Sequence, residues 1–255
     1  MGDRRELIRL EGVLVQARVD GETSLPVDWT LDEGEFWVVG GLNGSGKSPW
    51  LSTTAGLYPP NGGRQMIFGQ DIREMAERDR AALRAKIGFV FENTGRLFAE
   101  LNVVENVALP LSYQRNCPAE DVLPEVQRVL DACGLSEHAA SEPNTLGRGI
   151  QRRVALARAL VLEPELLMVD SPLTSQDPMQ TRWWVDFLTL MHRAEHNFKT
   201  PRTIVVTTED FGPWLAENRR FALLDGGEFQ VLGDYNDVAV HTRPVVRDML
   251  TGRSA

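Results

Sequence analysis

A glycine-rich segment with one lysine and one terminal serine, GLNGSGKS at residues 41–48, carries the clearest chemical signal in the sequence. It fits the pattern G-x-x-x-x-G-K-S and lies between a predicted strand and a predicted helix. The glycines let several backbone N–H groups point at one anion, Lys47 can reach the β and γ phosphates of a nucleotide, and the Ser48 hydroxyl can ligate Mg²⁺. The segment therefore predicts a phosphate-binding loop. The residues expected to contact the nucleotide are Gly41, Asn43, Gly44, Ser45, Gly46, Lys47, Ser48 and Pro49.

A short apolar run ends in a second candidate ligand. The run ELLMVD at residues 165–170 reads as a buried strand that presents Asp170 at its end. A carboxylate in that place can hold Mg²⁺ through water. A buried strand that ends in aspartate is common by itself, so the prediction of a Mg²⁺-nucleotide site depends on its combination with the glycine-rich loop.

Pro49 follows the loop directly and departs from what such a loop needs. Proline is tolerated in the first turn of a helix, because the N–H groups of that turn have no partner within the helix. In a phosphate-binding loop, however, those free N–H groups are the donors to the phosphates. We expect Pro49 to remove one phosphate hydrogen bond, at a cost of about 1–2 kcal/mol of binding free energy.

The pattern of apolar residues predicts strands that alternate with helices. Strands are expected within 7–40 and at 65–69, 87–92, 165–170 and 203–208, helices from about 47 and at 71–85, 151–162 and 181–196, and a hairpin at 221–233 with Asp225, Gly226 and Gly227 at its turn. Helical periodicity within 93–146 is expected to be broken by Pro110, Pro118, Pro124 and Pro143. Such alternation implies a parallel sheet with its ligand at the carboxyl ends of the strands.

Composition excludes several classes of protein. The 255 residues include 42% hydrophobic and 25% charged residues, which is ordinary globular usage, and they suffice for one domain. The formal net charge of −9 argues against nucleic acid as a partner, because that binding depends on clustered lysine and arginine. No apolar run is long enough to span a membrane, and the N-terminus has charges where a signal peptide is apolar. We expect a soluble, cytoplasmic protein.

Four segments together resemble the ATPase subunits of ABC transporters over nearly the whole chain. In order, these segments are GLNGSGKS, IGFVFENTGRLFAELNVVENVALPL, LGRGIQRRVALARALVLEPELLMVDSPLTSQDP and TIVVTTED. The resemblance is most specific in RRVALARAL followed by EPELLMVD. The segments ENVALPL and VVRDMLTG are similar to the lipid-trafficking (Mla-type) branch of that family.

The resemblance implies a fold, ligands and partners. The fold would be α/β, a P-loop NTPase core with a mainly parallel sheet, an N-terminal antiparallel β subdomain and an inserted α-helical subdomain. Residues 1–255 would form a single domain, with the core and β subdomain in 1–92 and 151–255 and the helical lobe in 93–150. The ligands would be ATP and Mg²⁺. The partners would be integral membrane permease subunits and a second ATPase, in a homodimer or a heterodimer, at the inner face of the cell membrane.

The family's signature motif, usually LSGGQ, corresponds to Leu146, Gly147, Arg148, Gly149 and Ile150. Gly147 lacks the serine hydroxyl that meets the γ phosphate across the dimer. Arg148 places a long side chain where the family has glycine for close backbone approach. Alternatively, Arg148 offers a cation to the phosphates. Gly149 is retained, and it is expected to contact the nucleotide of the partner.

The catalytic positions of the family also differ. Ser171 stands where the family has the glutamate that activates water, and Thr208 stands where it has the histidine that contacts the γ phosphate. Glu92 replaces the glutamine that senses Mg²⁺, so the expected metal ligands are Ser48, Glu92 and Asp170. A serine hydroxyl is no general base near neutral pH.

Other carboxylates could replace the missing base. Glu92 is the best candidate, and Glu209 and Asp177 are expected near the nucleotide as well. The family often has an aromatic residue that stacks on adenine in the segment that corresponds to the surroundings of Arg18. This sequence has no aromatic residue near Arg18.

These departures predict an ATP-binding transporter subunit whose hydrolysis is weak or absent. The altered signature and the missing base lie on one chain, so neither a homodimer nor a pair with an intact partner would contain a complete site. Two alternatives stay open. One is an active transporter ATPase whose unusual residues are compensated, and the other is a soluble pseudo-ATPase that acts as an interaction protein.

Overall fold

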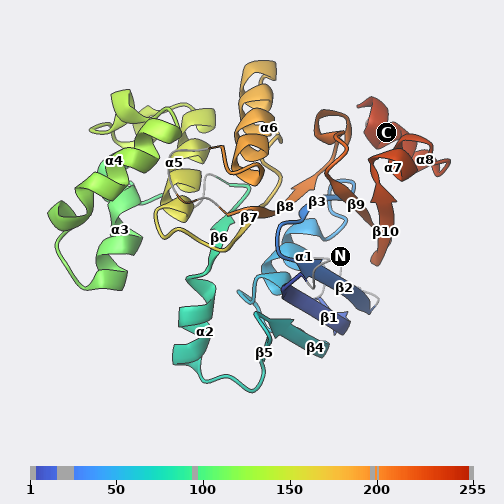
Figure 1. Cartoon of the computed structure of the whole chain (residues 1–255). Coiled ribbons are helices and arrows are strands. Elements are labelled where there is room, and N and C mark those ends of the chain that lie inside the picture. The colour runs from blue at the N-terminus through green and yellow to red at the C-terminus, as the bar shows by residue number, and fades with distance from the viewer. Residues whose placement is uncertain (1–3, 16–25, 94–96, 196–198, 200, 253–255) are drawn as a thin grey trace.

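The strands of the chain form two sheets, one antiparallel and one mainly parallel, with helices between and beside them (Figure 1). The computed structural model describes residues 4–15, 26–93, 97–195, 199 and 201–252. The strands are β1 (Glu6–Leu14), β2 (Val27–Asp32), β3 (Phe36–Gly40), β4 (Gly62–Ile67), β5 (Gln70–Asp71), β6 (Ile87–Val90), β7 (Leu166–Val169), β8 (Thr203–Thr208), β9 (Arg220–Asp225) and β10 (Glu228–Asp234). The helices are α1 (Lys47–Thr54), α2 (Glu77–Arg84), α3 (Val103–Arg115), α4 (Leu123–Ala132), α5 (Arg148–Leu160), α6 (Pro178–His192), α7 (Tyr235–Ala239) and α8 (Pro244–Thr251).

The mainly parallel sheet has the strand order β10-β9-β3-β8-β7-β6, in which β10 pairs antiparallel with β9. In register, Gly40 of β3 lies opposite Thr208 of β8, while Val169 of β7 lies between Val206 of β8 and Val90 of β6. The carboxyl ends of these four strands therefore meet at one edge of the sheet. Open α/β sheets bind their ligands at such an edge.

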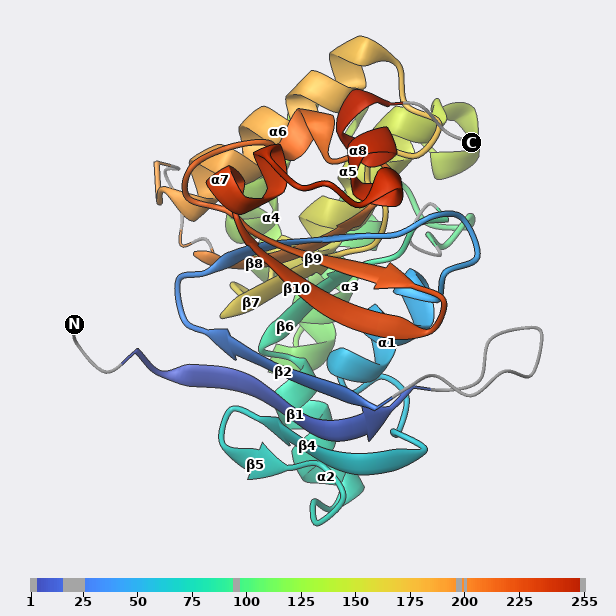
Figure 2. The same ribbon diagram turned by 90° about the vertical axis from the view of Figure 1, so that its right-hand side faces the viewer.

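The antiparallel sheet has the order β2-β1-β4-β5 and lies against the opposite side of α1 from the parallel sheet (Figure 2). Burial alternates along β2, as in a strand with one covered and one solvent-facing side. Alternate residues of β3 face two different apolar layers. Trp37 and Val39 join the layer that contains α1, and Phe36 and Val38 join the layer beneath the helices. The parallel sheet is thus covered on both faces, and its two central strands, β3 and β8, are wholly buried.

Aromatic side chains hold α1 in the layer between the sheets. Trp50 of α1 is fully buried, and its ring stacks on Phe229 with centroids 5.0 Å apart and planes 19° apart. The ring of Trp29 lies 5.3 Å from Trp50 and 5.4 Å from Trp37, both edge-on. Such pairs stabilise beyond the burial of their area. The helix that opens at the phosphate-binding loop is therefore fixed from its inner face.

The α/β architecture predicted from the sequence is confirmed, including the mainly parallel sheet and the antiparallel sheet at the N-terminal end. The predicted hairpin is also present. Gly226 and Gly227 form its two-residue turn, both with positive φ, as a type I′ turn requires. Helices α3 and α4 stand apart from the antiparallel sheet, on the other side of the molecule (Figure 1).

Two local predictions were wrong. The helix expected over 71–85 begins only at Glu77, because Asp71 pairs with Met66 in β5 and its side chain accepts a hydrogen bond from the Arg73 N–H, which favours a turn. Pro110 does not interrupt a helix, since α3 continues through it. A proline inside a helix removes one backbone hydrogen bond, and the apolar packing of α3 against α5 offsets that loss.

A buried asparagine fixes the chain from Phe98 to the start of α3. Asn106 is fully buried, and the two N–H donors of its side-chain amide are shared among the carbonyls of Phe98, Leu101 and Asn102. Its side-chain oxygen accepts from the Phe98 N–H. The side chain thus meets the hydrogen-bonding needs of a segment with no regular structure.

The C-terminal helix packs behind the ligand-binding edge of the parallel sheet. The Phe211 N–H, which lies just beyond β8, donates to the carbonyl of Met249 in α8 at 2.8 Å. Gly40, the last residue of β3, leaves no room for a side chain. A Cβ there would lie 2.2 Å from the ring of Phe211 and 2.5 Å from the methyl of Met249.

We therefore expect Gly40→Ala to lower the free energy of unfolding by about 1–3 kcal/mol through overpacking. The measurement is the urea midpoint of the purified protein. Gly147→Ser is the matched control, because a Cβ at Gly147 meets nothing within 4 Å and its φ is an ordinary −64°. A Gly40→Ala protein as stable as the unaltered chain would contradict this packing.

Candidate nucleotide-binding site

A pocket of about 200 Å³ opens at the carboxyl edge of the parallel sheet. The glycine-rich loop and the start of α1 form one side of it, and residues that follow β6, β7 and β8 form the other. Its lining residues are Asn43, Gly44, Ser45, Gly46, Lys47, Ser48, Pro49, Glu92, Ser171 and Glu209. The structure thus brings together most of the site residues expected from the sequence.

The loop has the backbone geometry of an anion cradle. Gly44 and Gly46 adopt φ of +76° and +97°, values that a side chain disfavours, and Gly46 is the N-cap of α1. The Ser45 N–H closes a tight turn onto the carbonyl of Leu42. Gly41 allows this turn, because a Cβ there would lie 2.4 Å from the Ser45 hydroxyl. The first N–H groups of α1 consequently point out of the helix end toward the pocket.

Lys47 is the cation of the pocket. Its side chain is only 5% exposed, and the ammonium donates to the carbonyls of Gly41 at 2.7 Å and Leu42 at 2.9 Å. A Glu209 oxygen lies 3.7 Å from the same nitrogen. Burial lowers the pKa of the Lys47 ammonium, and the neighbouring carboxylates, Glu209 first among them, partly oppose that shift.

Asp170 belongs to a buried hydrogen-bond network with Ser171, which follows it in the chain, and with Thr207 at the end of β8. The Thr207 hydroxyl donates to the Asp170 carboxylate at 2.7 Å and accepts from the Ser171 N–H at 2.8 Å. The hydroxyls of Ser171 and Thr207 lie 3.3 Å apart. Thr207 was not singled out in the sequence. Its signal is the alternation along β8, which places Thr207 and Thr208 on opposite faces of the sheet.

Thr208 lies at the edge of the site, but its hydroxyl is engaged elsewhere. It donates to the carbonyl of Asp210 at 2.9 Å and accepts from the Asp210 N–H and the Trp214 ring N–H, each at 3.2 Å. The side chain of Thr208 is 3% exposed and does not line the pocket. The structure therefore gives this hydroxyl a part in fixing the turn after β8.

Glu92 lies across the pocket from the loop. Burial raises the pKa of the Glu92 carboxyl, the charges of Asp170 and Glu209 raise it further, and the cations Arg152 and Lys47 lower it. Arg152 is itself buried and donates to the carbonyls of Pro172 and Thr174, which fixes the chain beyond Ser171.

The signature residues lie outside this pocket, and so does Asp177, which was expected near the nucleotide. Gly147 is the N-cap of α5, and Arg148 is exposed in its first turn. Gly149 lies against the side chain of Gln180, which comes within 3.0 Å of where its Cβ would be. Asp177 caps α6 by accepting the Gln180 N–H. In a single chain, none of these four residues contacts the pocket.

The donor set of the pocket fits Mg²⁺-nucleotide. Ser48, Glu92 and Asp170 supply oxygens, which Mg²⁺ prefers, and the phosphates of a nucleotide would complete its shell. Among the described residues, no group of three or more histidine, cysteine or acidic side chains is placed to hold a metal alone. The Ser45 hydroxyl is buried in the loop without a partner in the described chain, as expected of a group that awaits a ligand. Arg18 lies outside the described residues.

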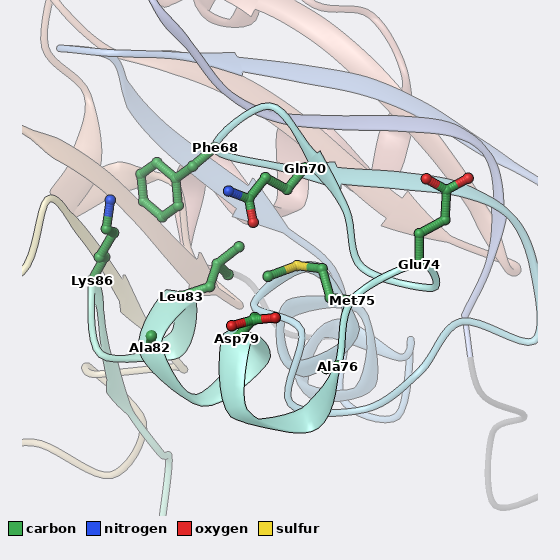
Figure 3. A pocket seen from close by; sticks show the side chains of 9 residues that line it. All are labelled: Phe68, Gln70, Glu74, Met75, Ala76, Asp79, Ala82, Leu83 and Lys86. Atoms are coloured by element: carbon green, nitrogen blue, oxygen red, sulfur yellow. The ribbon is translucent and has the colours of Figure 1, made fainter.

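A second pocket, of about 460 Å³, lies between the β4–β5 turn and α2 (Figure 3). Its floor is apolar, with Phe68, Met75 and Leu83, and its walls carry the carboxylates of Glu74 and Asp79. The one lysine that lines it, Lys86, is already paired with Glu165 at 3.3 Å. The larger volume does not make it a phosphate site, since it lacks both a backbone cradle and an uncommitted cation.

Comparisons with known proteins agree with this geometry. A family model described as ABC transporter matches residues 25–174. The chain belongs to the ABC transporter family. It is 30% identical over 216 residues to the methionine import ATP-binding protein MetN 2 of Pseudomonas syringae pv. tomato, an alignment that covers 85% of this chain and 63% of that protein. It is 34% identical over 212 residues to MetN 2 of Rhodococcus jostii, covering 83% and 60%. The chain thus spans less than two thirds of the length of these relatives.

Solved structures in the ABC family show the same fold. The dimeric ATP-binding cassette MJ0796, in a post-hydrolysis state with ADP and Pi, superposes with a TM-score of 0.76 at 28% identity, covering 88% of this chain and 98% of that one. CbiO1 of Clostridium perfringens superposes with a TM-score of 0.78 at 23% identity, covering 93% and 92%, and supports the fold alone. The predicted membership of the family and its α/β fold are confirmed. The placement in the Mla-type branch stays a prediction, because the relatives named above are methionine import proteins.

No helix in the described part of this ABC family chain combines the length and the apolar character that crossing a bilayer requires.

Pro49 occupies the third position of α1 and lines the pocket. Because it has no N–H, we expect Pro49→Thr to tighten ATP binding about tenfold through one recovered phosphate hydrogen bond. Pro49→Ala, which restores the N–H without a hydroxyl, should give most of the same gain. Isothermal titration of each protein with ATP and Mg²⁺ measures the effect, and equal affinities in all three proteins would rule the explanation out.

Proposed function

We propose that this chain is the ATP-binding subunit of an ABC transporter, which binds Mg²⁺-ATP at Gly41–Ser48 and hydrolyses it weakly or not at all. The observation that supports this most is the pairing of a phosphate cradle around Lys47 with Ser171 at the place of the catalytic base. Binding and turnover need different groups, and only the groups for binding are in place.

The missing base is the main reason to expect slow hydrolysis. The Ser171 backbone and hydroxyl are directed at Thr207, and a serine hydroxyl accepts no proton from water near neutral pH. Base assistance is commonly worth roughly 10² to 10⁴ in rate. Thr208, with its hydroxyl held by Asp210 and Trp214, offers no positive charge to a γ phosphate.

Bound Mg²⁺ would neutralise phosphate charge and orient the phosphates. In this chain, Ser48, Glu92 and Asp170 would hold it. Asp170 is fixed for this role by the hydrogen bond from Thr207.

The same proposal includes a dimer and a membrane partner at the inner face of the cell membrane. The related cassette MJ0796 is described as dimeric, and Gly147 and Arg148 are exposed here, where a second chain could meet them. Tyr113 on α3 is 87% exposed, and Phe98, Leu109 and Leu123, which lie before, in and after that helix in the sequence, are also exposed apolar residues. Exposed apolar side chains of this kind are suited to contact with a permease subunit.

One observation favours a second function, that of an active transporter ATPase. Glu92 lines the same pocket as Ser171, and its raised pKa brings it closer to that of a general base for water. In that case Glu92 would be the general base for hydrolysis, in place of the glutamate that the family has at the position of Ser171.

Steady-state ATP turnover of the purified chain, alone and with any copurifying permease, separates the two functions. We expect turnover indistinguishable from that of Lys47→Ala, while ATP binding is lost in Lys47→Ala alone. Family-like turnover that Lys47→Ala abolishes would contradict the proposal, and its loss in Glu92→Gln would then identify the base.

We also expect Ser171→Glu to raise turnover at least about tenfold, because it returns a carboxylate to the wall of the pocket. Ser171→Gln is the matched control, since it has the same length and shape without a base. Equal turnover in both variants would show that the absence of a base is not what limits hydrolysis.

A further inference from the structure

The ammonium of Lys47 is held by the chain itself. A lysine has three N–H donors, and two of them go to the carbonyls of Gly41 and Leu42. The third direction is taken by the carboxylate of Glu209 at 3.7 Å. A phosphate that binds Lys47 must therefore replace a partner that is already negative.

The turn after β8 places Glu209 in this position. Its neighbour Thr208 bonds both the N–H and the carbonyl of Asp210, so the backbone on either side of Glu209 is fixed. Asp210 is in turn held by the Gly212 N–H, which donates to its carboxylate at 2.8 Å. Glu209 is the one acidic side chain of this turn that lines the pocket. Its own side chain is 39% exposed, which leaves it free to swing toward solvent.

The pocket carries more negative than positive charge before a nucleotide enters. Glu92 and Glu209 line it, Asp170 lies beneath it, and all three act electrostatically on Lys47. Arg152 adds a second cation, but its donors go to the carbonyls of the chain after Ser171. A metal-free triphosphate would be repelled by these carboxylates, and a bound divalent cation would cancel much of that repulsion.

We propose that Glu209 holds Lys47 in the nucleotide-free pocket and makes the site select metal-complexed over metal-free nucleotide. Glu209 is thus a specificity-determining residue. Its effect is measured as the difference between the affinities for ATP with and without metal. This inference rests on the proposed function, because it concerns the same nucleotide site.

The inference distinguishes Glu209 from the metal ligands. Removal of a metal ligand such as Asp170 should weaken binding of Mg²⁺-ATP. Removal of Glu209 should instead strengthen ATP binding, and most strongly when metal is absent, because the repulsion is then largest and Lys47 is released to the phosphates.

The test is titration of the full chain with ATP, once with Mg²⁺ and once with EDTA. We expect Glu209→Gln to bind metal-free ATP about tenfold or more tightly than the unaltered chain does. With Mg²⁺ present, the affinity of Glu209→Gln for ATP should exceed that of the unaltered chain by a smaller factor. The matched control is Glu217→Gln, which makes the same chemical change at an exposed glutamate outside the pocket. The Glu217→Gln protein should match the unaltered chain in both conditions.

Each outcome bears on the inference. If Glu209→Gln binds ATP with the same ratio of metal-free to Mg²⁺ affinities as the unaltered chain, or binds more weakly, the proposed selectivity is wrong while the nucleotide site stands. If the unaltered chain binds ATP only with Mg²⁺ and Glu209→Gln also binds it with EDTA, the inference is supported. If neither binds, both the inference and the proposed function are contradicted. Far-ultraviolet circular dichroism and the urea midpoint of each variant establish that it is folded, and Glu209→Ala gives a second test of the same charge.

Discussion

The buried ammonium of Lys47 is the constraint on which the rest of the site depends. A charge with so little contact with water is stable only when it is hydrogen-bonded and paired. Here two carbonyls of the loop and the carboxylate of Glu209 meet that need. The two carbonyls can converge on one nitrogen only if the backbone turns sharply, which the positive φ of Gly44 and Gly46 allows. The loop is thus curled around its own cation, with its free N–H groups left for an anion.

The fold brings the remaining groups to that cation. Parallel pairing of β3, β8, β7 and β6 aligns their carboxyl ends, so Glu209, Asp170 and Glu92 approach Lys47 from three neighbouring strands. The polar groups beside Asp170 satisfy one another, since Thr207 bridges Asp170 and Ser171. A fold shared with ATP-hydrolysing cassettes therefore does not by itself imply their turnover, because function depends on the groups in the site.

Much of this arrangement could be predicted from the sequence, because it depends on local spacing. The loop at 41–48, the strand before Asp170 and the turn at Gly226 follow from glycine positions and apolar alternation. Other features depend on contacts between distant segments. The three hydrogen bonds of Thr208 and the bridge made by Thr207 require the side-chain directions at the end of β8, and the late start of α2 reflects the pairing of Asp71 with Met66. Spacing alone contains none of these contacts.

A single-turnover experiment tests the central claim, binding without turnover, most directly. Protein in excess over labelled ATP is mixed with Mg²⁺, and the bound nucleotide is quantified as ATP or ADP over time, with Lys47→Ala as the reference for binding. The account predicts that the label stays bound as ATP for as long as the complex persists, and that Lys47→Ala forms no such complex. Conversion of the bound ATP to ADP within seconds would contradict it.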